Sequence, residues 1–355
     1  MNTLSSARPA PRKLALGLIL VLPLIWAACA IPAQAATAAE RAKAPQSKAQ
    51  SKAPAKASAK VSSKPAAKGR PTVAPAKRKA VAKAKARAAT SDLVLKSNAA
   101  LVIDEDSGEA VALKNPDMVL PIASLTKLMT GLVVIDAKLP MDEVLEISSA
   151  DVDTEKHTYS RLAVGSQLTR DEMLLLALMS SENRAAMALS RNYPGGREAF
   201  IAAMNLKAKT LGMASTHFAD PAGLSNRSVS TARDLHRLLI AARAQPLMRS
   251  HTTQLESTVH THGRTLTFGN TNRLVRAAGD WNIDLQKTGF TNEAGRCLVM
   301  HVTVEGRRLA MIFLDSDGTL TRYADAARVR RRLALEAKAS NQPGPIATSV
   351  AASSS

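Results

Sequence analysis

The chain has 355 residues, 46% of them hydrophobic, and a formal net charge of +19. This size and composition allow a large hydrophobic core, so a wholly disordered protein is excluded. The charge is uneven: residues 36–90 hold 15 basic residues and one acidic residue, residues 1–35 add +3, and the rest of the chain nets only +2. The high charge therefore belongs to the N-terminal part and not to the predicted folded part.

Residues 1–35 have the three parts of a secretory signal peptide. Arg8, Arg12 and Lys13 precede the apolar run "LALGLILVLPLIWAACAI", and the small residues "PAQAA" follow it. We expect cleavage after Ala35. Two alternatives remain open: a retained membrane anchor, and lipoprotein processing at "WAAC", which ends at Cys29.

Residues 36–90 consist almost only of Ala, Lys, Pro, Ser and Arg. Such a segment cannot bury enough apolar surface to offset the entropy of ordering, so a disordered linker is predicted. The linker is interpreted as a solvated spacer, with weak contact to anionic polymers of a cell wall or membrane surface as the alternative. A secreted protein rarely meets nucleic acid, so no nucleic-acid partner is expected.

The chain contains two cysteines, Cys29 and Cys297. Cleavage of the signal peptide would leave one thiol, which excludes an intramolecular disulfide. Cys297 lies in "RCLVMHVTV", which alternates like a half-buried strand. A core cysteine is therefore predicted and not a nucleophile.

From about residue 91 the pattern changes to strands and helices. Residues 98–115 predict a β-hairpin that turns at Asp106, Ser107 and Gly108. Helices are predicted from residue 121, from Thr169 with a capping box to Glu172, over 196–213 ending at Gly212, and over 323–338. Three strand-like runs, residues 281–290, 296–306 and 307–316, predict an antiparallel meander. An α+β domain over 91–338 is expected, with both strand groups in one antiparallel sheet flanked by helices, an all-helical cluster, and a disordered tail over 339–355.

The predicted helix "PIASLTKLMTG" carries Ser124 and Lys127 one turn apart in an otherwise apolar run. Ser124 falls in the first turn, where free N–H groups favour a developing negative charge. Lys127 can activate that serine only when it is neutral. Lowering its pKa from 10.4 to about 7 costs roughly 4 to 5 kcal/mol, which burial and a second cation are expected to supply.

Two further motifs accompany this pair. "SEN", Ser181 to Asn183, interrupts two apolar helices, where a polar tripeptide has no structural reason to lie. "KTG", Lys287 to Gly289, ends a predicted strand and occurs once in the chain. A cation, a hydroxyl and a glycine at a strand edge can hold a carboxylate while a peptide backbone lies close. S-x-x-K and S-x-N are each weak alone, but the ordered set is specific.

S-x-x-K, S-x-N and K-T-G in this order are characteristic of penicillin-binding proteins and class A β-lactamases. Over residues 91–335 the chain resembles a penicillin-binding serine DD-peptidase. "PIASLTKLMTGLVV", "ALMSSENRAA", "DPAGLS", "STARDL" and "KTGFTNEAGRCLVM" resemble the low-molecular-mass D-alanyl-D-alanine endopeptidase branch, the penicillin-binding protein 7 type. The resemblance implies the β-lactamase/DD-peptidase-like fold.

The resemblance also implies roles for individual residues. Ser124 would be the acyl-ester nucleophile, Lys127 its proton acceptor, and Ser181 a proton relay to the leaving amine. Asn183 would bind the substrate amide, and Lys287 with Thr288 would bind the carboxylate. Gly289 would also belong to the substrate-binding residues. The oxyanion hole would use the backbone N–H groups of Ser124 and Phe290. Glu182 stands where Asp is common in that branch, at a position that is not catalytic.

Other hydrolytic chemistries find less support. No G-x-S-x-G elbow is present, and His260 and His262 lie in a polar hairpin-like stretch, so a Ser-His-Asp triad is not expected. The chain has no H-E-x-x-H motif, and neither a metal nor a cofactor is expected. A β-lactamase is disfavoured, because no E-x-x-L-N stretch lies between Ser181 and Lys287.

The resemblance predicts hydrolysis of D-alanyl cross-links in peptidoglycan, with peptide stems as substrates and β-lactam antibiotics as covalent inhibitors. Only about 65 residues follow "KTG", which favours an endopeptidase over a D-alanyl-D-alanine carboxypeptidase. The carboxypeptidase remains the first alternative, and a catalytically silent wall-binding protein the second. A periplasmic location and a role in wall remodelling and cell shape are expected from the signal peptide and the substrate.

Overall fold

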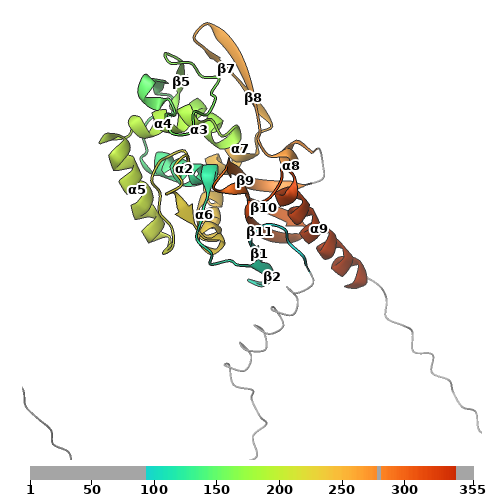
Figure 1. Cartoon of the computed structure of the whole chain (residues 1–355). Helices are drawn as coiled ribbons and strands as arrows, with labels where there is room; N and C mark the ends of the chain where they lie inside the picture. Colours follow the sequence, from blue (N-terminus) through green and yellow to red (C-terminus); the bar gives the residue numbers. More distant parts are fainter. Residues whose placement is uncertain (1–92, 278–280, 341–355) are drawn as a thin grey trace, which may run out of the picture. The chain divides into compact units, whose positions relative to one another are not determined.

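One antiparallel sheet of five strands, in the order β2-β1-β11-β10-β9, forms the centre of the protein (Figure 1). The structure is a computed structural model and describes residues 93–277 and 281–340. The strands are β1 (Ala99–Asp104), β2 (Ala110–Lys114), β9 (Asn282–Thr291), β10 (Gly295–Val304) and β11 (Arg307–Ser316). Because β1 pairs with β11, the N-terminal hairpin and the C-terminal meander share one sheet, as the sequence predicted.

The two faces of this sheet are covered by different helices. On one face, Leu298 and Met300 pack with Tyr323 and Val329 of helix α9 (Thr321–Ser340). On the other face, side chains such as Val299 join the core that contains helices α2 and α6. Alternate residues of β10 thus enter two separate cores, because successive side chains of a strand point to opposite faces. Side chains on both faces of the sheet are buried from solvent, which explains why β10 and β11 are apolar almost throughout.

Most of the remaining helices gather on one side of the sheet. They are the 3-10 turns η1 (Ala123–Thr126) and η2 (Ser149–Asp151) and the helices α2 (Lys127–Asp136), α3 (Arg170–Met179), α4 (Asn183–Arg191), α5 (Gly196–Thr210), α6 (Ala232–Arg243) and α7 (Pro246–Thr253). The short helix α8 (Arg273–Arg276) lies elsewhere, since its Leu274 packs against the core that contains α9. Three short strand pairs accompany them: β3 (Leu120–Pro121) with β6 (Val229–Ser230), β4 (Val144–Glu146) with β5 (Gln167–Thr169), and β7 (Glu256–Thr261) with β8 (Arg264–Gly269). No helix within the described ranges is long and apolar enough to span a membrane.

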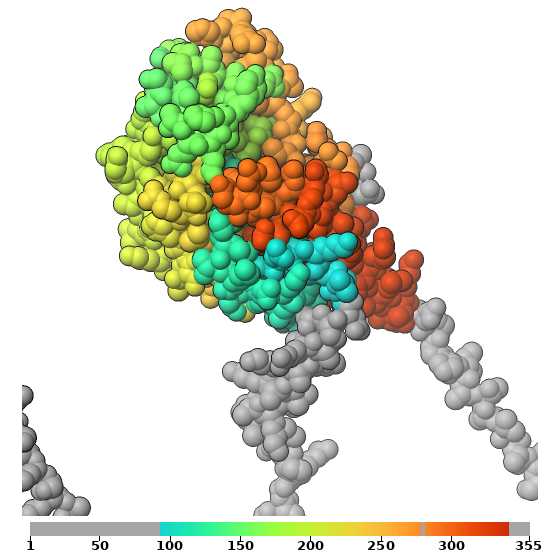
Figure 2. All heavy atoms as spheres, viewed as in Figure 1, coloured from blue at the N-terminus to red at the C-terminus, as the bar shows by residue number. Residues whose placement is uncertain are grey.

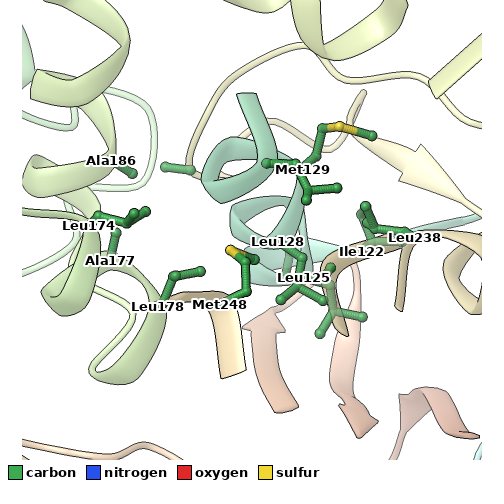
Figure 3. Packing of buried hydrophobic residues seen from close by; sticks show 14 of the residues in the cluster. Ile122, Leu125, Leu128, Met129, Leu174, Ala177, Leu178, Ala186, Leu238 and Met248 are labelled. Carbon is green, nitrogen blue, oxygen red and sulfur yellow. The ribbon is translucent and has the colours of Figure 1, made fainter. Parts of the chain in front are cut away.

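Helix α2 runs through the middle of the helical side. Leu125, Leu128 and Met129 are fully buried against neighbouring helices, and Leu178 of α3 and Met248 of α7 line the same core (Figure 3). Helix α3 is buried along its whole apolar run, as the sequence predicted. The predicted capping box is also present, since the Thr169 hydroxyl accepts from the Glu172 amide and the Glu172 carboxylate accepts from the Thr169 amide.

Two expectations differ in detail. The helix expected from residue 121 begins as the 3-10 turn η1 and becomes α-helical only at Lys127, because Ala123 has a positive φ of 47°. At the other end, α9 continues to Ser340, two residues beyond the expected domain limit. The expected signal peptide, the linker and residues 341–355 of the expected tail lie outside the described residues.

A buried charge cluster lies at the end of the sheet nearest α6. His301 on β10 is 1% exposed, and its Nδ1 lies 2.6 Å from Asp284 Oδ1 on β9 and its Nε2 2.9 Å from Glu105 Oε2. Arg243 of α6 donates to Asp284, and His236 faces Glu105. Ionised carboxylates only accept hydrogen bonds, so both ring nitrogens of His301 donate and the ring is an imidazolium.

The stability of the fold should depend on pH through His301. Burial lowers the pKa of His301, but the hydrogen bonds to Asp284 and Glu105 outweigh it and raise the pKa above its ordinary value. Because the pKa of His301 is higher in the folded than in the unfolded protein, protonated His301 stabilises the folded state. This contribution is fully present below the unfolded pKa of about 6.5, and it is lost as the pH rises through the folded-state pKa. His301→Gln should lose about 3 kcal/mol of unfolding free energy at pH 6 and less at pH 9, measured by urea denaturation. A loss that is equal at both pH values would contradict this account.

Candidate active site

Ser124 and Lys127 are brought into direct contact by the junction of η1 and α2. The Lys127 ammonium nitrogen Nζ lies 2.9 Å from Ser124 Oγ, within hydrogen-bonding distance. The 3-10 turn places Ser124 at the surface of the buried segment, since Ala123, Leu125 and Thr126 on either side are buried. The junction thus presents one hydroxyl beside one amine, as the S-x-x-K spacing predicted.

Lys127 is completely buried and has two further partners. Its Nζ donates to Asn183 Oδ1 at 2.7 Å and to the Ala222 carbonyl at 2.7 Å. Burial lowers the pKa of Lys127 to about 8, although the carboxylates of Asp220 and Glu182 oppose this shift. A base with this pKa is partly neutral near neutral pH and is suited to accept a proton from Ser124.

The loop Asp220–Ser225 holds the Ala222 carbonyl in place under Lys127. The Asp220 carboxylate accepts backbone N–H groups from residues 222–225, which closes the loop on itself. Gly223 has a φ of +76°, and a Cβ there would lie 1.9 Å from the Ala123 carbonyl oxygen. Only glycine fits so close to η1, so the quoted "DPAGLS" stretch has a direct structural reason beside the nucleophile.

Ser181 and Asn183 lie in the break between α3 and α4, as predicted. Ser181 has a positive φ of 63°, and Asn183 is the first residue of α4. Asn183 uses both ends of its amide: Oδ1 accepts from Lys127, and Nδ2 donates to Thr158 Oγ1 at 2.9 Å. Glu182 caps α4 by accepting from the Arg184 amide, and burial raises its pKa.

The KTG segment forms the opposite wall from strand β9. Lys287 is fully buried and its Nζ donates to Ser181 Oγ at 3.0 Å. Burial, together with the positive charges of Lys127 and Arg322, places the pKa of Lys287 well below its usual value. The expectation that a second cation lowers the pKa of Lys127 is not met: burial alone lowers it, and the charge of Lys127 lowers the pKa of Lys287 instead. The site thus contains two Ser–Lys pairs, Ser124 with Lys127 and Ser181 with Lys287.

The two neighbours of Gly289 differ in exposure, since Thr288 is buried and Phe290 is exposed. Thr288 is 5% exposed, and its hydroxyl lies 2.7 Å from Thr271 Oγ1, so this hydroxyl has a protein partner. The Phe290 side chain is 50% exposed and lies under the guanidinium of Arg296, 4.2 Å from its ring centre. The stacked Arg296 covers part of an aromatic ring that otherwise faces solvent at the edge of the site.

Gly289 lets β9 approach the nucleophile closely. A Cβ built at this position would lie 3.0 Å from the Ile122 carbonyl oxygen and 3.3 Å from the Ser124 amide nitrogen. Strand β9 therefore passes directly beside the Ser124 N–H. This proximity fits the oxyanion hole that the resemblance implied for the amides of Ser124 and Phe290.

Gly289→Ala should impair acylation and leave the fold intact. The added methyl must push β9 from Ser124 by a few tenths of an ångström, and small misplacements of reacting groups reduce rates by about 10- to 100-fold. The measurement is the acylation rate with a fluorescent penicillin. Gly269→Ala on the hairpin strand β8 is the matched control, since a Cβ there meets no atom within 4 Å. Equal rates for both variants would contradict the close approach.

Four contacts of the site were missed from the sequence. Arg322 of α9 is 7% exposed and donates to the Gly289 carbonyl at 3.2 Å, and Thr271 bonds Thr288. Thr158 bonds Asn183, and the Ala222 carbonyl bonds Lys127. Ala222 lies in the quoted "DPAGLS" stretch, but no local motif marks the other three residues.

Residues that the sequence placed outside the site do lie outside it. His260 and His262 are exposed on the β7–β8 hairpin. Among the described residues, no histidine is hydrogen-bonded to Ser124 or Ser181. Cys297 is fully buried on β10, and burial raises the pKa of its thiol to about 11, so it stays protonated. A Ser-His-Asp triad and a thiolate nucleophile are both incompatible with this arrangement.

A sheet covered on both faces, with two Ser–Lys pairs between its edge strand and a helical region, defines a serine peptidase of the penicillin-recognising class. The chain belongs to the D-alanyl-D-alanine carboxypeptidase (peptidase S11) family, whose family model matches residues 84–318. The fold class expected from the sequence is confirmed.

Two curated relatives are named D-alanyl-D-alanine endopeptidase. The one from Pseudomonas aeruginosa is 53% identical over 241 residues, which cover 67% of this chain and 77% of the relative. The one from Escherichia coli is 48% identical over 238 residues, which cover 66% and 76%. Both resemble this chain in the folded part, in agreement with the branch expected from the sequence.

Solved structures of similar fold include the Streptomyces K15 DD-transpeptidase. It matches with a TM-score of 0.63 at 27% identity, over 67% of this chain and 97% of that one. A D-alanyl-D-alanine carboxypeptidase from Mycobacterium tuberculosis matches with a TM-score of 0.61, also at 27% identity, over 68% and 92%. The fold is therefore shared by relatives whose names specify different reactions on D-alanyl peptides.

Proposed function

We propose that the protein is a serine-type D-alanyl-D-alanine endopeptidase that hydrolyses D-alanyl cross-links between peptidoglycan stems. The observation that carries the proposal is the Ser124–Lys127 contact of 2.9 Å, with the buried Lys127 at a pKa of about 8. The names of the relatives at 53% and 48% identity support the endopeptidase over other DD-peptidases. A D-alanyl-D-alanine carboxypeptidase is the second candidate, since more distant relatives carry that name.

The proposed reaction has two steps. Lys127 takes the proton of Ser124, whose oxygen attacks the D-alanyl carbonyl while the amides of Ser124 and Phe290 stabilise the oxyanion. Ser181, hydrogen-bonded to Lys287, passes a proton to the leaving amine as the C–N bond breaks, and the proton that Lys127 took from Ser124 restores Ser181, which leaves an acyl-enzyme on Ser124. Water then hydrolyses the ester. β-Lactams would acylate the same serine and act as covalent inhibitors.

Substrate binding is assigned to the groups around this centre. Asn183 would release one of its present partners to bind the substrate amide, and Lys287 with Thr288 would bind the carboxylate. Gly289 would let the substrate backbone lie against β9. Thr288 would exchange its hydrogen bond with Thr271 for one to substrate.

Cross-linked muropeptide dimers and monomeric pentapeptides distinguish the two candidate reactions. The purified protein is incubated with each, and products are separated by liquid chromatography and mass spectrometry. We expect the dimers to be cleaved to monomers. Surviving dimers together with loss of D-Ala from pentapeptides would establish the carboxypeptidase instead.

The sequence of the N-terminal part also supports a proposal for where in the cell the protein acts. A periplasmic protein is proposed, because the apolar run of residues 14–31 has signal-peptide flanks and the substrate lies outside the cytoplasm. The basic segment over 36–90 would contact anionic wall polymers and keep the catalytic domain near its substrate. A role in wall remodelling and cell shape would follow from cutting cross-links.

Deleting residues 36–90 should weaken attachment to the wall without affecting chemistry. The segment carries a net charge of +14, and contacts of this kind weaken as salt screens them. We expect less salt-sensitive binding to isolated sacculi in a co-sedimentation assay, and unchanged turnover of soluble muropeptides. Unchanged co-sedimentation would restrict the segment to a spacer.

A further inference from the structure

One wall of the active site is extended by a loop over Val152–Ser160. The loop is attached to a substrate-binding residue, because Thr158 Oγ1 accepts from Asn183 Nδ2 at 2.9 Å. The buried Asp153 carboxylate gives it shape by accepting the amides of residues 155, 156 and 158 at 2.9 to 3.0 Å. The loop is therefore ordered by its own hydrogen bonds and fixed to the helical side.

The other wall is extended by the turn between β9 and β10. This turn follows directly on the KTG strand and includes Glu293, three residues after Phe290. It is also ordered, because the Ala294 amide donates to Thr291 Oγ1 at 3.1 Å.

Lys156 of the loop and Glu293 of the turn form an ion pair that joins the two walls. Their side chains are 28% and 38% exposed, so the pair lies at the surface. The hydrogen bond from Lys156 holds the pKa of Glu293 below its usual value. In Figure 2, green atoms of the helical side meet orange atoms of the sheet side on the face shown. The pair thus spans from the wall of Asn183 to the wall of Lys287.

We propose that the Lys156–Glu293 pair is a reversible strap across the mouth of the active site, which a bulky cross-linked peptide must open to enter. An exposed ion pair is weak, and salt screens it, so it can open rapidly. The strap would therefore lower productive binding of a branched peptide and act less on a compact β-lactam. This specificity role rests on the proposed function.

The strap predicts a particular change in kinetics. At low salt, Lys156→Ala and Glu293→Ala should each raise kcat/KM for muropeptide dimers about two- to fivefold, through KM, with kcat unchanged. Adding NaCl to about 0.5 M should bring the wild type up to the variants, because the pair is then screened. The charge-reversed double variant K156E/E293K should restore low kcat/KM and the salt dependence.

Arg308→Ala is the matched control, because Arg308 forms a similarly exposed ion pair with Asp106 at the opposite end of β10 and β11. This variant should match the wild type at every salt concentration. If Lys156→Ala and Glu293→Ala also match the wild type, the strap is refuted. Should the protein trim pentapeptides but not cut dimers, the same comparison is made with pentapeptides. Failure of the proposed function is thereby kept separate from failure of the strap.

Discussion

Ser124→Ala should abolish covalent labelling by a fluorescent penicillin and reduce peptide hydrolysis by about 10⁴-fold or more. The reason is chemical: the acyl-enzyme needs the Ser124 oxygen, and the other serine described in the site, Ser181, is hydrogen-bonded to Lys287 and not to Lys127. The loss of one oxygen of the half-buried Ser124 in a 3-10 turn should change the unfolding temperature little. Labelling is measured by gel fluorescence, and stability by circular dichroism.

The matched control is Ser180→Ala, which removes a neighbouring hydroxyl that donates to the Leu176 carbonyl within α3. This variant should be labelled like the wild type. Persistent labelling of Ser124→Ala would show that another residue is the nucleophile. Loss of labelling in Ser180→Ala would indicate that the α3–α4 break, and not Ser124 chemistry, governs reactivity.

Acylation should also follow the protonation of Lys127. With a pKa of about 8, the neutral fraction of Lys127 falls about tenfold for each pH unit below that value. The rate of penicillin acylation should therefore rise with pH and level off above about 8. Lys127→Ala, which removes the general base, should lower the rate by about 10²- to 10⁴-fold and flatten this profile.

Glu182→Gln offers a separate test of the same pKa. The Glu182 carboxylate is buried beside Lys127 and opposes its deprotonation. Replacing it with a neutral amide of similar shape should move the midpoint of the acylation profile to lower pH. Stopped-flow acylation across the pH range gives this midpoint for both proteins. A midpoint that does not move, or moves upward, would contradict the assigned coupling.

Local patterns predicted the elements of this fold because their causes are local. The hairpin turn at Asp106–Gly108, the Thr169 capping box and the apolar run of α3 each depend on residues a few positions apart. That the N-terminal hairpin and the C-terminal meander share one sheet was also predicted, but the strand order, with β1 beside β11, is shown only by the structure. The start of α2 was predicted too early, since Ala123 has a positive φ and residues 123–126 form a 3-10 turn.

The sequence predicted the site residues that lie within its three motifs. Ser124 and Lys127 are three residues apart, so one turn of helix joins them. The contacts that complete the site are distant: Thr271 bonds Thr288 across 17 residues, and Arg322 bonds Gly289 across 33. The strap from Lys156 to Glu293 spans 137 residues. Only the folded arrangement shows such pairs, because nothing in either local sequence specifies the partner.

The sequence predicted the direction of the pKa shift of Lys127 but not all of its causes. Burial was expected to lower its pKa, and the structure agrees. The opposing carboxylates of Asp220 and Glu182 were not foreseen, because Asp220 comes close only through the tight loop at Gly223. The balance of burial against these two charges places the pKa near 8, about one unit above the value first required.

The most direct measurement is peptide mapping by mass spectrometry of the wild-type protein after reaction with benzylpenicillin. We predict a single adduct on the peptide that contains Ser124, formed faster at pH 8 than at pH 6. An adduct on the peptide that contains Ser181, or no adduct at any pH, would contradict the account.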